Sequence, residues 1–215
     1  MDAAQRELND QIDQATQRLL DDARLLPDSE LRAPSLLPGW TRAHVLAHVA
    51  RSADAMRNLL IGVRSGQDRE AYPSAQARED GIGEGAAARA EDLMADLAGS
   101  AMALRAMVRQ LPDQAWQVPV RMLDSAPFPA VGLLTRRLVE VELHHTDLAV
   151  GYSPADWGAA FASMGLAEPM RSQREERLSY TQPAISARAQ SAARPAPPYR
   201  PGQPLPGSWI GRSRS

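Results

Sequence analysis

All four histidines of this 215-residue chain fall into two short clusters, His44 with His48 and His144 with His145. Imidazole nitrogens are common ligands of divalent metal ions. His44 precedes His48 by four residues, and Glu140 precedes His144 by the same spacing. Side chains four residues apart on a helix project from one face, one turn apart. The pair His44 and His48 and the pair Glu140 and His144 can therefore each present two side chains in one direction.

Two neighbouring helices could bring His48, His144 and Glu140 to one point. Two imidazoles and a carboxylate suit zinc, iron, manganese or nickel. Three protein ligands leave positions open for water or substrate, as in catalytic rather than structural metal sites. Asp147 shares the arc of Glu140 and His144, so Asp147 or His44 could orient a ligand imidazole. His44 could equally replace one of the three as a direct ligand.

A competing interpretation is that these histidines pack in the core of the protein and bind no metal ion. A histidine in an apolar helix is more often a hydrogen-bonded core residue than a ligand, and one such pair arises easily by chance. Two pairs at ligand spacing in one small chain favour metal binding.

The elements that must position these residues are helices. Apolar residues recur at helical spacing in four segments, at about 3–26, 41–63, 84–110 and 128–149. Thr41 is a plausible N-cap of the second segment, and Gly151 and Pro154 follow the fourth. No stretch shows convincing strand alternation, so the pattern predicts an all-α four-helix bundle. The predicted loop at 64–83 is longer than a bundle needs and is a candidate functional segment.

The composition changes after the fourth segment. Residues 168–215 hold 8 of the 17 prolines and 8 arginines against 3 glutamates. Such a segment cannot bury enough apolar surface to offset its ordering entropy. We therefore expect a folded body at 1–162 and a disordered or irregular Pro/Arg-rich tail at 163–215, with no recognisable second domain.

The composition also excludes several functions. The chain has no cysteine, which removes disulfides, thiolate metal sites and a cysteine nucleophile. All 24 basic residues are arginine, so lysine Schiff-base chemistry and P-loop phosphate binding have no residue to carry them. The acidic body argues against nucleic acid as a partner. No apolar run is long enough to cross a membrane and no secretion signal is visible, so we expect a soluble, cytoplasmic protein.

Two segments of the chain resemble the signatures of the mycothiol-dependent maleylpyruvate isomerase family. They are LPGWTRAHVLAH at 37–48, and EVELHHTDL at 140–148 followed by GYSPADW at 151–157. The resemblance extends over about residues 5–162. It implies a DinB-like four-helix bundle that binds one divalent metal ion, usually zinc.

The resemblance also implies roles for individual residues. The family's metal ligands fall on His48, Glu140 and His144, which selects His48 over His44. An arginine that the family carries after its second helix falls on Arg78, which would meet an anionic substrate or shape the metal pocket. The alternative for Arg78 is an ordinary solvated loop arginine.

The chemistry implied by the resemblance uses an external thiol, mycothiol, as a cosubstrate. The thiol would ionise at the open metal position, add to the double bond of maleylpyruvate, allow rotation and leave as fumarylpyruvate forms. Related members transfer the thiol to electrophiles. The implied partners are a small thiol and a small anionic or electrophilic substrate, and the chain would be a monomer or homodimer.

One departure from the family keeps a second interpretation open. Family isomerases carry a C-terminal domain with a substrate-binding arginine, and the tail of this chain does not resemble it. The alternative to an isomerase or thiol transferase is therefore a non-catalytic metal-binding bundle, such as a sensor or a partner-binding module.

Overall fold

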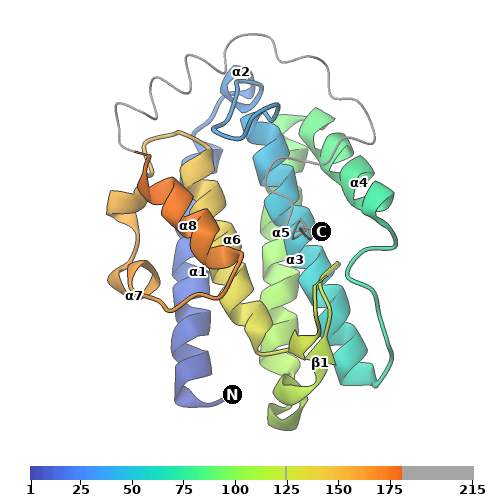
Figure 1. Cartoon of the computed structure of the whole chain (residues 1–215). Coiled ribbons are helices and arrows are strands. Elements are labelled where there is room, and N and C mark those ends of the chain that lie inside the picture. The colour runs from blue at the N-terminus through green and yellow to red at the C-terminus, as the bar shows by residue number, and fades with distance from the viewer. Residues whose placement is uncertain (124, 181–215) are drawn as a thin grey trace, which may run out of the picture.

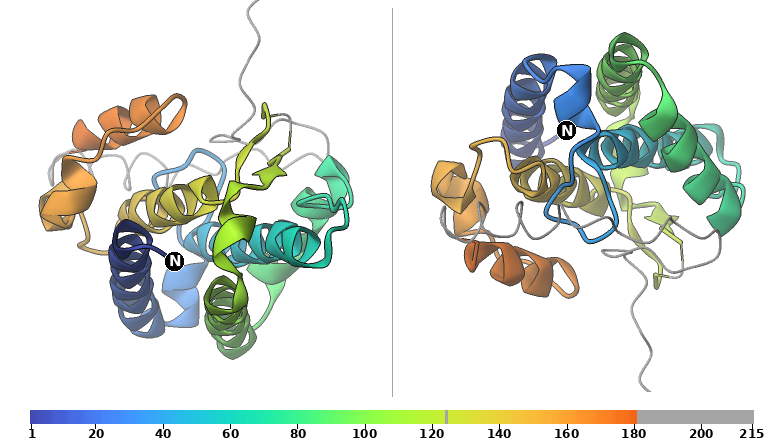
Figure 2. Two further views of the ribbon diagram at one scale, coloured as in Figure 1. Left: turned by 90° about the horizontal axis from the view of Figure 1, so that it is seen from below. Right: turned by 90° about the horizontal axis from the view of Figure 1, so that it is seen from above.

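Four long helices form the bundle in the computed structural model, which describes residues 1–123 and 125–180 (Figure 1). They are α1 (Ala3–Arg24), α3 (Arg42–Ser65), α5 (Ala90–Gln110) and α6 (Gly132–Asp147). Helix α3 is the central one, since it packs against α5, α6 and the shorter helix α4 (Ala75–Ala87). Views along the bundle show α3 among these three helices, with α1 beside α6 (Figure 2). The predicted all-α DinB-like bundle is confirmed.

Local sequence explains where the first two bundle helices begin. Asp2 and Gln5 form a reciprocal capping box at the start of α1. Thr41 caps α3 as predicted, because its side chain accepts a hydrogen bond from the backbone N–H of His44. Helix α3 ends at Ser65 and is capped by Gly66, whose left-handed backbone (φ +65°) is typical of glycine.

The predicted loop at 64–83 and helix at 84–110 were wrong in detail. Much of the loop belongs to α4, which Ser74 caps by accepting a hydrogen bond from Ala77 N–H. The extended backbone of Ala88 and Arg89 then separates α4 from α5. Because α4 buries only a narrow stripe and contains three glycines, its helical pattern is weak in the sequence.

A small strand pair precedes α6. Strands β1 (Pro119–Val120) and β2 (Phe128–Pro129) are antiparallel, with Val120 opposite Phe128. Two-residue strands are too short for alternation to be visible in a sequence. Since β2 occupies the expected start of the fourth helix, α6 begins at Gly132 rather than near residue 128.

Short helical segments complete the described chain. They are α2 (Asp28–Leu31), η1 (Asp113–Gln117), η2 (Pro154–Asp156), α7 (Ala159–Ala162) and α8 (Met170–Leu178). None of the helices in the described ranges is long and apolar enough to cross a membrane.

Helix α8 lies inside the range 163–215 that the sequence predicts to be irregular, so that boundary needs correction. It packs against α6 and buries Met170 and Arg177. Its arginine-rich composition conceals this contact, because Arg177 is buried by an ion pair rather than by apolar packing. The rest of the expected tail, residues 181–215, lies outside the described residues.

Candidate metal centre

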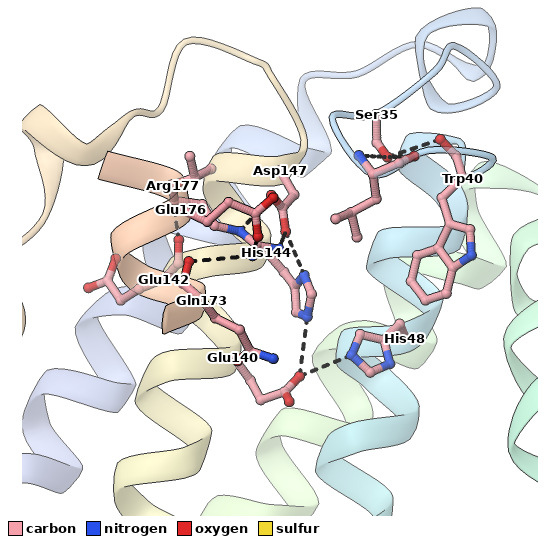
Figure 3. A network of polar contacts seen from close by, with 12 residues as sticks. Ser35, Trp40, His48, Glu140, Glu142, His144, Asp147, Gln173, Glu176 and Arg177 are labelled. Carbon is pink, nitrogen blue, oxygen red and sulfur yellow. Dashed lines mark hydrogen bonds and ion pairs between the residues drawn. The ribbon is translucent and has the colours of Figure 1, made fainter. Parts of the chain in front are cut away.

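Three side chains converge between α3 and α6. His48 comes from α3, and Glu140 and His144 come from successive turns of α6 (Figure 3). All three are at most 5% exposed. Each offers one ligand atom, and these atoms lie within 4.8 Å of one another. The structure thus brings together the three residues that the sequence predicts as ligands.

The distances within this cluster fit donors that share one ion. Glu140 Oε2 lies 3.1 Å from His48 Nε2 and 3.5 Å from His144 Nε2. Two nitrogen or oxygen ligands at tetrahedral positions, with bonds of about 2.0–2.1 Å, are separated by about 3.3 Å. Neither contact is aligned as a hydrogen bond, and Glu140 Oε2 is buried with no hydrogen-bond partner among the described residues. A buried, unsatisfied carboxylate oxygen facing two imidazole nitrogens fits a divalent cation.

The electrostatics of the cluster set two of the ligands in their metal-binding form. Burial lowers the pKa of His48 to about 4 against the opposing effect of Glu140, so this imidazole is neutral. Burial raises the pKa of Glu140, but His48 and His144 together hold it well below its usual value. Burial also opposes charge on His144, yet Asp147 and Glu140 raise its pKa to about 9. A metal ion would therefore displace a proton from His144.

Asp147 orients His144. Its Oδ2 lies 3.0 Å from His144 Nδ1, and its side chain is fully buried. Carboxylates commonly accept the second N–H of a ligand histidine, which fixes the ring and its tautomer. Of the two orienting candidates in the sequence, the structure places Asp147 in that position.

His44, the other candidate, is not near the cluster's ligand atoms. Its Nδ1 lies 2.7 Å from Thr41 Oγ1 and also accepts from the Thr41 backbone N–H, so the ring belongs to the cap of α3. The choice between His44 and His48 therefore follows from where α3 begins.

Two further polar residues of α6, His145 and Glu142, face α1 instead of the candidate metal centre. His145 Nε2 lies 2.9 Å from Asp22 Oδ2, and the His145 ring stacks on Tyr152 with a centroid separation of 3.7 Å. Glu142 accepts hydrogen bonds from Arg18 and from the Tyr152 hydroxyl. These contacts attach α6 both to α1 and to Tyr152 in the segment that follows α6.

Arg78 contacts the cluster from α4 and is only 5% exposed, which excludes the solvated loop position. Its Nη2 lies 3.3 Å from His48 Nδ1, and its Nη1 donates to Glu79 at 2.6 Å. The Trp40 ring meets the His48 ring edge-on at 5.5 Å. His48 is thus held between an arginine and an indole.

Sequence reasoning missed two residues of α8. Arg177 donates to both carboxylate oxygens of Asp147, and the Gln173 side chain extends from α8 in the direction of Glu140 (Figure 3). No spacing signal links either residue to the histidines, because the contact depends on how the chain returns after α6.

The chain is similar to a known family and to solved structures. The model of the mycothiol maleylpyruvate isomerase N-terminal domain matches residues 12–149. Two similar solved structures are a mycothiol-dependent maleylpyruvate isomerase, at 28% identity and a TM-score of 0.71, and a histidine-to-alanine mutant of such an enzyme, at 27% and 0.70. Each match covers 73% of this chain and 65% of the solved chain, so this chain spans less than two thirds of their length. A search of curated proteins found no match.

Proposed function

This chain belongs to the mycothiol maleylpyruvate isomerase family, and from that premise we propose that it is a metal-dependent enzyme that uses an external thiol. His48, Glu140 and His144 would hold one divalent ion, for which zinc is the proposed identity. The thiol would be mycothiol, and the substrate a small electrophilic acid such as maleylpyruvate. The observation that carries the proposal is the unsatisfied Glu140 oxygen between two imidazole nitrogens.

The bound ion would supply a positive charge that favours the thiolate form of a thiol at neutral pH. The chain has no cysteine, so the thiol must come from outside. A thiolate can add to the carbon–carbon double bond of the substrate, and rotation about the resulting single bond followed by loss of the thiolate gives the trans isomer. A reduced thiol cosubstrate suits a cytoplasmic location.

Arg78 is proposed to meet the anionic substrate. An imidazole that binds a metal through Nε2 carries its proton on Nδ1, whereas a guanidinium can only donate hydrogen bonds. The contact between Arg78 Nη2 and His48 Nδ1 is therefore incompatible with metal binding through Nε2. Arg78 would turn away from Nδ1, and its charge would then be available to a substrate carboxylate beside the centre.

A non-catalytic metal-binding bundle is the second candidate. It is favoured by one observation, which is that the matching family model describes an N-terminal domain alone. Both candidates use the same ligands, and they differ in whether a thiol and a substrate react.

Elemental analysis of the purified chain tests the metal site. We expect about one divalent ion per chain in the wild type and none in His48→Ala or Glu140→Ala. His44→Ala is the matched control, because it removes an imidazole one turn away that caps α3, and it should keep the ion. A wild type without metal after reconstitution contradicts the proposal and leaves a helical scaffold.

Turnover separates the two candidates. The loaded wild type is mixed with maleylpyruvate, with and without mycothiol, and formation of the trans isomer is followed. Isomerisation that requires mycothiol supports the enzyme, and Arg78→Met should raise the KM for the substrate. A loaded chain with no thiol-dependent turnover of maleylpyruvate or of other electrophiles favours the binding module.

A further inference from the structure

Helix α8 reaches the candidate metal centre from outside the region that the family model describes. That model ends at residue 149, whereas α8 spans Met170–Leu178 and packs on α6. In Figure 3, Arg177 lies beside Asp147, and Gln173 of the same helix extends toward Glu140. Helix α8 therefore adds side chains to the side of the centre formed by α6.

The contact between Arg177 and Asp147 is a bidentate ion pair. Arg177 Nε donates to Asp147 Oδ1 at 3.1 Å, and Nη2 donates to Oδ2 at 2.9 Å. The two side chains are only 5% and 0% exposed. Both oxygens of the carboxylate are engaged, and Oδ2 also lies 3.0 Å from Nδ1 of the ligand His144.

We propose that Arg177 is a positioning residue of the metal centre, acting on His144 through Asp147. This inference rests on the proposed metal site. The parallel donors of a guanidinium fix the plane of a carboxylate, which a single ammonium group does not do. With its plane fixed, Asp147 presents Oδ2 to the His144 Nδ1–H, and the lone pair of Nε2 is directed toward Glu140.

The charge of Arg177 is needed because Asp147 lies in the protein interior. Asp147 is 0% exposed, and Arg177 is its cationic partner at both carboxylate oxygens. A buried carboxylate that loses its cationic partner is costly, and it turns toward another donor or moves toward solvent. Either change would remove the acceptor that holds the His144 ring.

A neighbouring arginine shows that docking of α8 and support of the centre are separate tasks. Arg174, one turn earlier, donates to the backbone oxygens of Phe161 and Met164 at 2.8 Å each. It ties α8 to the preceding α7 segment and, within the described part of the chain, has no hydrogen bond or ion pair with Asp147 or the ligands. Arg174→Met is therefore the matched control for Arg177→Met, since both remove one guanidinium from the same helix.

Zinc affinity of the full-length chain, measured by competition with a chromophoric chelator, tests the inference. We expect Arg177→Met to weaken zinc binding about 10–100-fold, as loss of an outer partner of a ligand histidine usually does. Asp147→Asn should weaken zinc binding similarly. The variant that combines Arg177→Met with Asp147→Asn should bind zinc little more weakly than either single variant, because both substitutions act on one contact. Arg174→Met should bind zinc like the wild type. The visible spectrum of the cobalt form should change in Arg177→Met and not in Arg174→Met.

The outcomes separate this inference from the proposed function. A wild type that binds no zinc or cobalt contradicts the metal site itself. A folded Arg177→Met variant with wild-type zinc affinity and cobalt spectrum overturns only the role of Arg177. If Arg177→Met does not fold, Arg177→Lys decides, since it keeps the charge but not the parallel donors. Weaker zinc binding by Arg177→Lys supports the inference, and wild-type affinity overturns it.

Discussion

His48 and His144 flank the same carboxylate oxygen, but their surroundings differ sharply. His48 is enclosed by Trp40 and α4, and burial lowers its pKa to about 4. His144 has the Asp147 carboxylate on its other nitrogen, and its pKa is raised to about 9 despite burial. Glu140 Oε2 contacts the Nε2 atoms of both rings, so we expect the cluster to depend most on this residue.

Glu140→Gln tests that dependence with little change of shape. The amide keeps the size of the side chain but removes the negative charge that a divalent ion needs. We expect zinc affinity to fall by more than the roughly 10–100-fold that loss of an outer partner costs. Chelator competition measures the effect. Glu142→Gln is the control, because Glu142 lies on the same helix but pairs with Arg18 and Tyr152. Equal zinc affinity in Glu140→Gln and the wild type would exclude Glu140 as a ligand.

The sequence predicts part of this cluster for a clear physical reason. Glu140, His144 and Asp147 lie within two turns of one helix, so their relative directions follow from helical spacing alone. Spacing does not decide between His44 and His48, because that depends on the cap at Thr41. Arg78 was placed near the site only by resemblance.

Among the elements, α4 is a helix that the sequence conceals. Its three glycines disfavour a helix, yet one of them has a packing role. A Cβ added at Gly85 would lie 2.8 Å from the Cβ of Ala47 on α3, closer than real side chains approach. A Cβ at Gly83 would meet nothing within 4 Å. The close approach of α4 to α3 is also what brings Arg78 to His48.

The two glycines therefore predict opposite effects on stability. Gly83→Ala should raise the free energy of unfolding by up to about 1 kcal/mol, because alanine favours a helix. Gly85→Ala gains the same propensity but overpacks the contact with Ala47, which costs about 1–3 kcal/mol, so we expect net destabilisation. Urea unfolding of both variants measures this. Ala47→Gly should relieve the clash in the double variant. A Gly85→Ala chain as stable as Gly83→Ala would contradict the close approach.

The remaining elements differ in whether the sequence close to them contains a pattern that predicts them. The bundle helices could be predicted because each has a long apolar stripe, and α3 also has a recognisable cap. The ladder of β1 and β2 has two residues per strand, too few for alternation. Helix α8 is concealed because its buried groups include Arg177, which a composition argument assigns to solvent.

At the scale of the whole molecule, the candidate centre joins segments that are far apart in the chain. His48 and Glu140 belong to different helices. Arg78 of α4 contacts His48, and Arg177 of α8 contacts Asp147, the partner of His144. The contacts of His145 and Glu142 fix α6 to α1 without using the ligands. Since these contacts do not involve the ion, we expect the bundle to fold without it, and the ion would add a link between α3 and α6.

This arrangement predicts a stability change of the whole fold on metal binding. A ligand that binds only the native state stabilises it by RT ln(1 + [L]/Kd), about 2.7 kcal/mol at a hundredfold excess over Kd. For a domain of this size each kcal/mol raises the Tm by about 2–4 °C, so saturating zinc should raise it by about 5–10 °C. Calorimetry of the chelator-treated chain, with and without zinc, measures the shift. The Tm of Glu140→Gln should be the same with and without zinc, whereas the Tm of Glu142→Gln should rise with zinc as it does in the wild type. An equal rise in Glu140→Gln would place zinc elsewhere on the molecule and remove the link between ion binding and the contact of α3 with α6.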